Sequence, residues 1–381
     1  MSVRILHLAD LHLGASFPSM GERGEERSRD LLAAFLRAVD FAAGKDHPID
    51  VVAIAGDLFD VHDPAEGLVY QVESALERLT GAGIAVLLVP GTHDAHAYRR
   101  SVYRRLRIPE GAHLFLAPTL EAGPRLTIRD ESVQTYGVAY DAAACERPLG
   151  EFRQTGLADY HVGVLHAALQ DSPTWKTRAN DLPITRTEIG ASGLHYVALG
   201  HFHNYAEIRE GTSVAVYPGT LEGRKFGENG PRYLVVATLG REAVSVERTP
   251  WNVRTVTEAV VDFQLAEIRE ERQLVERIAA FAGEREIVRV RLTGPAEFVF
   301  DAERLRAGLY PRFFHLEIDD RTYVVNARLL ERYRDEATVR GVFVRRMLER
   351  IERAEGSDAK ETAVLALRLG LSEFQNPRHA P

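Results

Sequence analysis

The sequence predicts an α/β protein with two sheets flanked by helices, then a small α+β domain and C-terminal helices. As far as residue 94, short apolar runs typical of buried parallel strands alternate with amphipathic helical patterns. From residue 133 to residue 247 strand-like runs predominate, joined by longer connections, and two sheets would accommodate all of these strands. Polar residues follow the strands, so we expect the chemistry at the carboxyl ends of the strands.

Length and composition are those of an ordinary globular chain. Its 381 residues suffice for two or three domains, and 45% of them are hydrophobic and 27% charged. No apolar run is long enough to span a bilayer, and the first residues lead into a strand rather than a signal peptide. Cys145 is the single cysteine, which excludes an intramolecular disulfide framework and suits a reducing cytosol. We therefore expect a cytoplasmic protein.

The first sheet is predicted from alternating strands and helices. Continuous apolar runs predict strands, and apolar residues at helical spacing predict the helices between them. The expected strands are residues 3–9, 50–55 and 84–89, and the expected helices are residues 25–44 and 65–80. The strands end at Asp10-Leu11-His12, at Gly56-Asp57 and at Pro90-Gly91-Thr92-His93-Asp94.

The rest of the chain predicts further strands, which two sheets covered by helices would accommodate, and two further domains. Strands are expected at residues 133–138, 160–165, 195–199, 214–217, 233–238 and 243–247. The last three of these strands are expected to be antiparallel. After a change of composition near residues 251–257 we expect a helix at 264–281, a strand at 286–292 and a strand–helix pair at 297–309. The predicted domains are residues 1–254, 255–325 and 326–381, the last with a tail at 376–381.

Acidic and histidine residues follow nearly every predicted strand of the first domain. In Gly200-His201-Phe202-His203 the two histidines project to the same side of an extended backbone. Carboxylate and imidazole ligands together suit Mn²⁺, Fe²⁺ or Zn²⁺, whereas Mg²⁺ prefers oxygen ligands. The alternative is a scatter of core histidines and helix-capping aspartates, which the repeated context disfavours. The candidate ligands are Asp10, His12, Asp57, Thr92, His166, His201 and His203, beside His93.

These motifs resemble the calcineurin-like metallophosphoesterase superfamily. The order D-x-H, G-D, G-T-H-D, a lone His166 and G-H-F-H runs within residues 3–240. Leu6–Gly14, Gly56–Asp60 and the loop Tyr217–Arg224 further resemble the SbcD-like DNA-repair nucleases, which work with an SMC-like coiled-coil ATPase. The resemblance implies a two-sheet metallophosphoesterase sandwich, a capping domain and helices that dock the ATPase.

Carried over to this sequence, the resemblance implies two divalent metal ions. Mn²⁺ is the leading choice, with Mg²⁺, Fe²⁺ or Zn²⁺ as alternatives. His93 would be the general acid or would steady the transition-state charge, and a water activated by the two cations would attack phosphorus. Asp60 or Asp94 would fix the imidazole ring, although for Asp60 a role in the loop is an equal alternative. One metal would be held by Asp10, His12, Asp57 and His203, and the other by Asp57, Thr92, His166 and His201.

Thr92 departs from the family pattern, in which asparagine usually occupies this position. Threonine is shorter and offers only a neutral hydroxyl. We therefore expect a weaker second metal site rather than an inactive enzyme, since the other three ligands of that site are present.

Basic residues offer contacts to phosphate despite a net charge of −8. An arginine run follows the third motif, and a basic pair follows the last; solvated surface is the alternative for both. The candidate substrate-binding residues are Arg99, Arg100, Arg104, Arg224 and Lys225. An apolar stripe at residues 337–348 packs on its own domain or docks a partner.

The leading interpretation is a Mn²⁺-dependent DNA exonuclease or endonuclease of DNA repair and recombination. It is expected to form a homodimer and to partner an SMC-like ATPase, without a membrane. One alternative is a phosphodiesterase or phosphatase that acts on small esters, because the same metal motifs serve both. The other is an architectural subunit whose metal site is weakened at Thr92.

Overall fold

The computed structural model describes residues 2–46, 48–144, 147–154, 156–172, 175, 177–296, 298, 300–324 and 327–375. Cys145 and the predicted tail at 376–381 lie outside the described residues. Contacts divide the chain into two compact units, Met1–Thr255 and Val256–Pro381. The predicted further boundary at residue 325 stays a prediction. None of the described helices is both long enough and apolar enough to cross a membrane.

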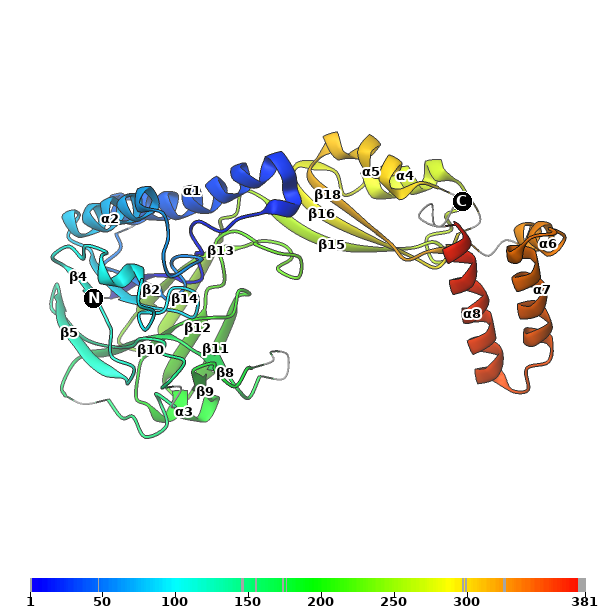
Figure 1. Ribbon diagram of the computed structural model, residues 1–381. Coiled ribbons are helices and arrows are strands. Elements are labelled where there is room, and N and C mark those ends of the chain that lie inside the picture. The colour runs from blue at the N-terminus through cyan, green and yellow to red at the C-terminus, as the bar shows by residue number, and fades with distance from the viewer. Residues whose placement is uncertain are drawn as a thin grey trace. The chain divides into compact units, whose positions relative to one another are not determined.

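The first sheet has six strands in the order β14-β13-β1-β2-β3-β4. Strands β1 to β4 run parallel, and β13 pairs antiparallel with β1. The strands are β1 (Val3–Leu8), β2 (Val51–Ala55), β3 (Ala85–Val89), β4 (Ala112–Leu114), β13 (Tyr233–Leu239) and β14 (Val244–Pro250). The helices α1 (Gly24–Ala43) and α2 (Glu66–Gly81) connect β1 to β2 and β2 to β3 and lie over one face of this sheet (Figure 1).

The second sheet also has six strands, in the order β11-β12-β10-β7-β6-β5. Its four central strands are parallel, and the outer strands β5 and β11 pair antiparallel. The strands are β5 (Glu121–Ile128), β6 (Glu131–Val138), β7 (Tyr160–His166), β10 (Tyr196–Gly200), β11 (Ala206–Glu210) and β12 (Ser213–Tyr217). The short pair β8 (Ala168–Leu169) and β9 (Pro183–Ile184) and the helix α3 (Arg186–Ala191) complete this half.

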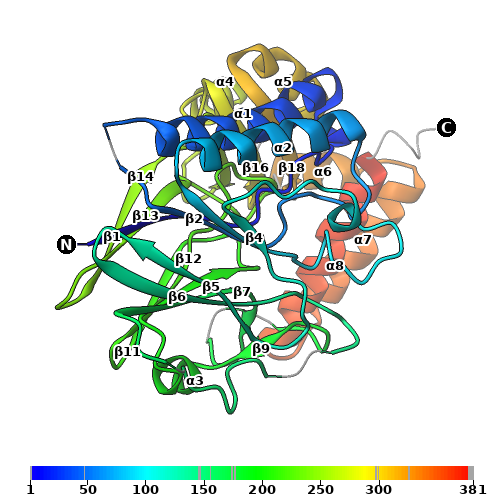
Figure 2. The same cartoon turned by 90° about the vertical axis from the view of Figure 1, so that its left-hand side faces the viewer.

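Three hydrophobic clusters give this unit its layers, which Figure 2 shows from the side. Because side chains alternate along a strand, Leu6 and Leu8 of β1 pack under α1 and α2, whereas Ile5 joins the cluster between the sheets. A third cluster lies on the outer face of the second sheet and includes Ile189 of α3. The mixed α/β fold with two sheets covered by helices is therefore as predicted.

The two sheets meet at the carboxyl ends of their strands, and Gly200 sits at this junction. A Cβ on Gly200 would lie 1.9 Å from the carbonyl oxygen of Ala55, the last residue of β2. Two hydrogen bonds cross the junction. The backbone N–H of His201 donates to the Asp10 carboxylate at 3.0 Å, and His166 Nδ1 lies 3.0 Å from the Ala55 oxygen. The predicted ligands from both sheets are thereby brought to one place.

The second unit contains a three-stranded sheet and a set of helices. The sheet has the order β15-β16-β18, and its helices share a buried cluster with its inner face. These elements are β15 (Thr255–Asp262), α4 (Glu271–Ala279), β16 (Gly283–Thr293), α5 (Ala302–Leu309) and β18 (Phe313–Asp320). Beyond them, β17 (Pro295–Ala296) pairs with β19 (Tyr323–Val324), and α6 (Ala327–Arg334), α7 (Val339–Glu352) and α8 (Ser357–Gln375) follow, with a separate cluster.

Two expectations for the second unit were wrong. The helix expected at 264–281 begins only at Glu271, because the Asp262 carboxylate accepts hydrogen bonds from the backbone N–H groups of Gln264 and Leu265 and forms a turn there. The strand expected at the start of the 297–309 pair is the short β17, which lies just before that range. In addition, β15 and β18 were not anticipated as strands.

Replacing Gly200 with alanine is expected to destabilise the protein, because the added methyl group meets backbone rather than a side chain that can move aside. We expect a loss of about 2–3 kcal/mol in the free energy of unfolding, the scale of overpacking in a rigid core. Urea unfolding followed by circular dichroism measures this loss. Gly67→Ala is the control, since Gly67 lies in α2 with open space around its Cβ position, and it should be neutral or stabilising. Equal stability of both variants would contradict the close approach.

Candidate metal centre

Four of the predicted ligands have a backbone conformation that L-residues rarely adopt. The angle φ is 51° at Asp10, 45° at His12, 49° at Asp57 and 107° at His201. Only two other non-glycine residues of the described chain have a positive φ. Aspartate and histidine tolerate this region better than most residues, and such strain persists where the surrounding structure fixes the backbone, commonly at functional sites.

The first potential metal site combines Asp10, His12 and His203. One ligand atom from each lies within 4.8 Å of the others. The Nε2 atoms of His12 and His203 lie 3.2 Å apart, although the two residues are 191 positions apart in sequence. Asp10 and His12 are fully buried. Two imidazole nitrogens that converge beside a buried carboxylate form a suitable donor set for a divalent cation.

The second potential site combines Asp10, Asp57 and His166. His166 Nδ1 faces the carbonyl oxygen of Ala55, which can only accept, so this nitrogen carries the proton. The opposite nitrogen, Nε2, is buried without a hydrogen-bond partner and lies 3.4 Å from Asp57 Oδ2. An orphaned buried nitrogen beside a carboxylate is the environment that a metal ion would satisfy.

Charges within the site shift the acid–base equilibria of its members. Burial would raise the pKa of Asp57, but the neighbouring His166 holds that pKa well below its usual range. Burial would lower the pKa of His166, but Asp57 raises it to about 10. Burial lowers the pKa of His12 to about 4.

The third motif wraps around Asp57. The backbone N–H of His93 donates to Asp57 Oδ1 at 2.8 Å, and the Thr92 hydroxyl donates to Oδ2 at 3.1 Å. A Cβ on Gly91 would lie 2.3 Å from the Asp57 carboxylate, so this turn needs glycine. The structure thus places Thr92 against a shared ligand and engages its hydroxyl proton there.

Asp94 holds this turn and does not face the His93 ring. Its carboxylate accepts hydrogen bonds from the backbone N–H groups of Gly91 and Phe59 at 2.7 and 3.0 Å and from the Tyr103 hydroxyl at 2.8 Å. Burial, with a contribution from the Asp57 charge, raises the pKa of Asp94 to about 6. The expected contact between Asp94 and an imidazole is therefore replaced by an internal brace of the loop.

His93 lies at the open side of the site. Its side chain is 45% exposed, and its ring meets the His12 ring edge-on at a centroid distance of 4.6 Å. Its Nδ1 lies 2.9 Å from the backbone oxygen of Asp60, so Nδ1 carries the proton and Nε2 is left to exchange one with a ligand. The Asp60 carboxylate lies nearer to His12, with Oδ1 3.2 Å from its Nδ1.

Two further carboxylates support the histidines of the last motif, and the sequence had not singled them out. Glu228 Oε1 lies 2.6 Å from His203 Nδ1, and Asp181 Oδ2 lies 3.4 Å from His201 Nε2. Because Nε2 of His201 faces Asp181, Nδ1 is the nitrogen that remains for a metal. Both carboxylates are buried. They lie in connections without motif context, so only the three-dimensional structure identifies them.

A cavity of about 590 Å³ opens over this site. Arg224 and Lys225, two of the predicted substrate-binding residues, line it together with Arg178. The cavity is lined by Ala15, Ser16, Phe17, Pro18, Ser19, Asp57, Thr92, His93, Arg178, Asp181, His201, Phe202, His203, Arg224 and Lys225.

The predicted arginines of the run after the third motif do not line this cavity. Arg99 and Arg100 are exposed, with Arg100 3.9 Å from Asp63. Arg104 donates to the backbone oxygens of Tyr98 and His96, which braces its own loop. The structure therefore separates the two basic groups that the sequence proposed, and only the pair at 224–225 lies beside the metal centre.

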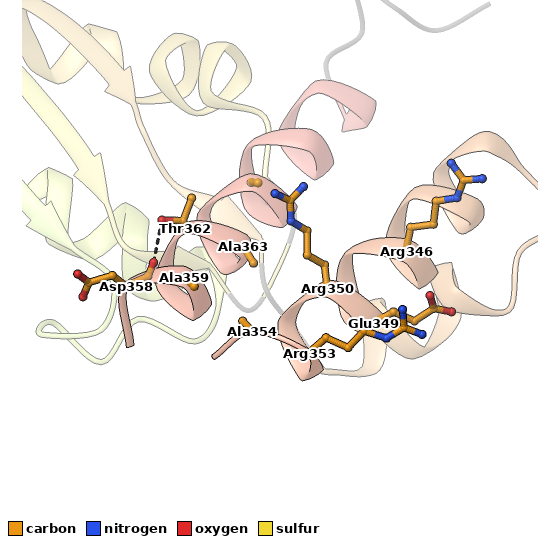
Figure 3. Close-up of a pocket in the computed structure, with 10 residues that line it drawn as sticks. Arg346, Glu349, Arg350, Arg353, Ala354, Asp358, Ala359, Thr362 and Ala363 are labelled. Atoms are coloured by element: carbon orange, nitrogen blue, oxygen red, sulfur yellow. Dashed lines mark hydrogen bonds between the residues drawn. The ribbon is translucent and has the colours of Figure 1, made fainter. Parts of the chain in front are cut away.

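A second cavity, of about 800 Å³, lies between α7 and α8 (Figure 3). Arg350 projects from α7 toward α8, and the Thr362 hydroxyl bonds to the backbone of Asp358. Alanine and arginine side chains predominate around it, and none of the predicted metal ligands is present. This cavity belongs to the helical part of the second unit and has no catalytic group in its lining.

Comparisons with known proteins point to one family. A family model described as calcineurin-like phosphoesterase matches residues 3–205. The uncharacterized metallophosphoesterase YhaO of Bacillus subtilis is 28% identical over 249 residues, which cover 64% of this chain and 59% of YhaO. The DNA double-strand break repair protein Mre11 of Aeropyrum pernix is 31% identical over 260 residues, covering 64% of this chain and 60% of that protein. The match thus spans about three fifths of either relative.

Among solved structures, the chain is similar to GAP50, described as the anchor in the inner membrane complex of Plasmodium. The TM-score is 0.39 at 10% sequence identity, and the match covers 65% of this chain and 84% of that chain. This likeness is too distant to carry an argument.

Mn²⁺ is expected to raise the melting temperature, because the carboxylates and imidazoles converge into a metal site only in the folded state. At a free concentration 100 times the Kd, a bound ion stabilises the fold by about 2.7 kcal/mol. Asp57→Asn removes the carboxylate nearest to His166 and should abolish most of this shift. Calorimetric scans with EDTA and then with Mn²⁺ measure both. A shift of equal size in the variant would show that the ion binds elsewhere.

Thr92→Asn is expected to tighten the binding of the second metal ion, because an amide oxygen reaches further than the hydroxyl that now bonds to Asp57. A contribution of about 1 kcal/mol corresponds to roughly fivefold in affinity. Thr92→Val, which keeps the shape and loses the hydroxyl, is the matched control and should not gain affinity. Titration calorimetry with Mn²⁺ compares the three proteins, and unchanged affinity in Thr92→Asn would refute the idea of a weakened site.

Proposed function

Because the chain belongs to the calcineurin-like phosphoesterase family, we propose that it is a metal-dependent nuclease that hydrolyses phosphodiester bonds of DNA. The family makes it a hydrolase that binds divalent metal ions, and the structure supplies candidate ligands. The observation that carries the proposal is the convergence of two overlapping ligand groups under an exposed histidine, His93, at the floor of an open cavity.

The residues of the chain divide the work of such a reaction. When bound, two divalent ions would supply Lewis-acid chemistry to the phosphate and lower the pKa of the attacking water. Asp10, His12, Asp57, His166 and His203 would hold these ions. The motif order would add His201 and Thr92 to the second site. His93, as imidazolium, donates the proton on Nε2 to the leaving oxygen, while its Nδ1–H stays on the Asp60 carbonyl and fixes the ring.

DNA is the proposed substrate on two grounds. The first is the similarity to Mre11 proteins, whose name describes DNA double-strand break repair. The second is the pair Arg224 and Lys225 on the cavity wall, where cationic side chains would contact the phosphate backbone. An exonuclease or an endonuclease activity is compatible with this arrangement, and Mn²⁺ suits the mixed nitrogen and oxygen ligands.

A role in a repair complex would need a docking surface for the SMC-like ATPase. By analogy with SbcD-like nucleases, that surface would lie on the C-terminal helices. In α7, Val339 is 77% exposed and Val342 is 43% exposed, whereas Val344 is buried against the neighbouring helices. The predicted stripe at 337–348 therefore both packs on its own unit and presents apolar side chains outward. A homodimer and a cytoplasmic location stay predictions.

A small-ester phosphodiesterase is the second candidate, supported by the similarity to the metallophosphoesterase YhaO. An assay of labelled single- and double-stranded DNA beside bis-p-nitrophenyl phosphate, in Mn²⁺ or Mg²⁺, separates the two functions. Cleavage of DNA supports the nuclease. Hydrolysis of the ester alone, even with an SMC-like ATPase added, supports the small-ester enzyme. Binding of a single metal ion without any hydrolysis would support an architectural subunit.

His93→Gln is expected to lower kcat by about 10²–10⁴-fold, because glutamine cannot donate a proton as an acid. KM for the ester and the affinity for Mn²⁺ should change little, since His93 belongs to neither of the two groups that contain Asp10. It lies in a third potential group, with His12 and Asp60. Steady-state kinetics and Mn²⁺ titration measure these quantities. A loss of metal binding equal to the loss of rate would instead make His93 a ligand.

Lys225→Ala is expected to weaken DNA binding and to reduce the slope of log affinity against log salt by about one unit. Arg99→Ala is the matched control, because Arg99 is exposed on the loop that does not line the cavity. Fluorescence anisotropy with labelled DNA in Ca²⁺ at several salt concentrations reports binding without relying on cleavage. A larger effect of Arg99→Ala would place the DNA over the arginine run instead.

A further inference from the structure

A carboxylate lies behind each of the two histidines of the first metal site. A histidine binds a metal through one nitrogen, and a partner on the other nitrogen fixes the ring and its tautomer. In this site the Nε2 atoms of His12 and His203 converge at 3.2 Å, so each Nδ1 points away from the site. Those two Nδ1 atoms meet Asp60 and Glu228, at 3.2 and 2.6 Å.

Glu228 is buried, with 3% of its surface exposed, and its carboxylate contacts His203 and the loop that carries Arg224 and Lys225. Oε1 accepts from His203 Nδ1, and Oε2 accepts the backbone N–H of Arg224 at 2.7 Å. The carboxylate therefore faces Nδ1 of His203, which leaves Nε2 of this ring for the metal.

Asp60 is tied to the same segment through Arg224. The Arg224 guanidinium donates to Asp60 Oδ1 at 2.5 Å, the same oxygen that faces His12 Nδ1. Arg224 therefore contacts one carboxylate with its side chain and the other with its backbone. The contacts close a ring in the order His12, Asp60, Arg224, Glu228 and His203, and the ring is completed where the two Nε2 atoms converge.

We propose that Asp60 and Glu228, joined through Arg224, form a clamp that presets the Nε2 atoms of His12 and His203 for a divalent metal ion. Asp60, Arg224 and Glu228 are positioning residues, since they act through the two histidines. The clamp also explains why the basic pair at 224–225 sits at the cavity, because the hydrogen bond to Glu228 fixes the backbone that carries both cations. This inference rests on the metal centre of the proposed function and does not depend on DNA as the substrate.

Glu228→Gln tests the clamp with almost no change in size. An amide offers one acceptor and one donor group, so it satisfies either His203 Nδ1–H or the Arg224 N–H but not both. We expect the affinity for the Mn²⁺ ion at the site of His12 and His203 to fall by about 10–100-fold. The affinity for the second Mn²⁺ ion should stay near that of the unaltered protein. Arg224→Met should lower the same affinity, whereas Arg224→Lys keeps a cation beside Asp60 and should lower it less. Titration calorimetry on the full chain measures all of these affinities.

Two controls separate positioning from a general loss of structure. Glu247→Gln removes an exposed carboxylate from β14 and should leave Mn²⁺ affinity unchanged. Melting temperatures in EDTA show whether each variant folds. If Glu228→Gln does not fold, Arg224→Met still tests the clamp. The nitrogen-15 spectrum of labelled histidines in the Zn²⁺-loaded protein, with His203→Gln for assignment, reports whether His203 carries its proton on Nδ1.

The outcomes are distinct. Weaker binding at one site together with a changed His203 signal in Glu228→Gln supports the clamp. Unaltered Mn²⁺ affinity and an unaltered His203 signal in folded Glu228→Gln and Arg224→Met would overturn it. If the unaltered chain binds no Mn²⁺ at all, the proposed function fails and the clamp fails with it. Tight binding without hydrolysis of DNA leaves the clamp supported and counts against the nuclease alone.

Discussion

The metal centre depends on the junction between the two sheets. The Asp10 carboxylate, from the first sheet, accepts the backbone N–H of His201 from the second, and His166 reaches back to the carbonyl of Ala55. At this junction the backbones of the two sheets approach so closely that residue 200 has no room for a Cβ. Each of these two hydrogen bonds joins a predicted ligand from one sheet to the backbone of the other sheet. The positions of the carboxylates and imidazoles are therefore set by the packing of the whole domain and not by any single loop.

Such a site places several ionisable groups where water is scarce, which is costly unless each group is paired. Hydrogen bonds satisfy the outward side of these groups: the Asp60 carbonyl holds His93, Ala55 holds His166, and Glu228 holds His203. The inward nitrogens and oxygens converge on one another and would be satisfied by cations. The arrangement is therefore prepared before a metal binds, and the left-handed backbone at Asp10 and Asp57 is part of that preparation.

The parts of the fold that could be predicted are those with a repeated local signal. Buried parallel strands, amphipathic helices and polar residues at strand ends predicted the first sheet and the gathering of Asp10, His12 and Asp57 at one edge. The partners of these residues could not be predicted, because Glu228 and Asp181 meet their histidines through tertiary contacts made by irregular connections. Asp94 likewise follows His93 in sequence, yet it bonds to Phe59 and Tyr103 instead.

The distance in sequence between His12 and His203 gives the metal centre a mechanical role. A cation that binds both would close a loop of 191 positions, in a chain that has a single cysteine and cannot form an internal disulfide. Closing so long a loop restricts the unfolded chain strongly. The ion would then serve as a removable cross-link between the two sheets, one that chelators break and reductants leave intact. The resistance of this domain to proteolysis would thereby follow the supply of metal in its surroundings.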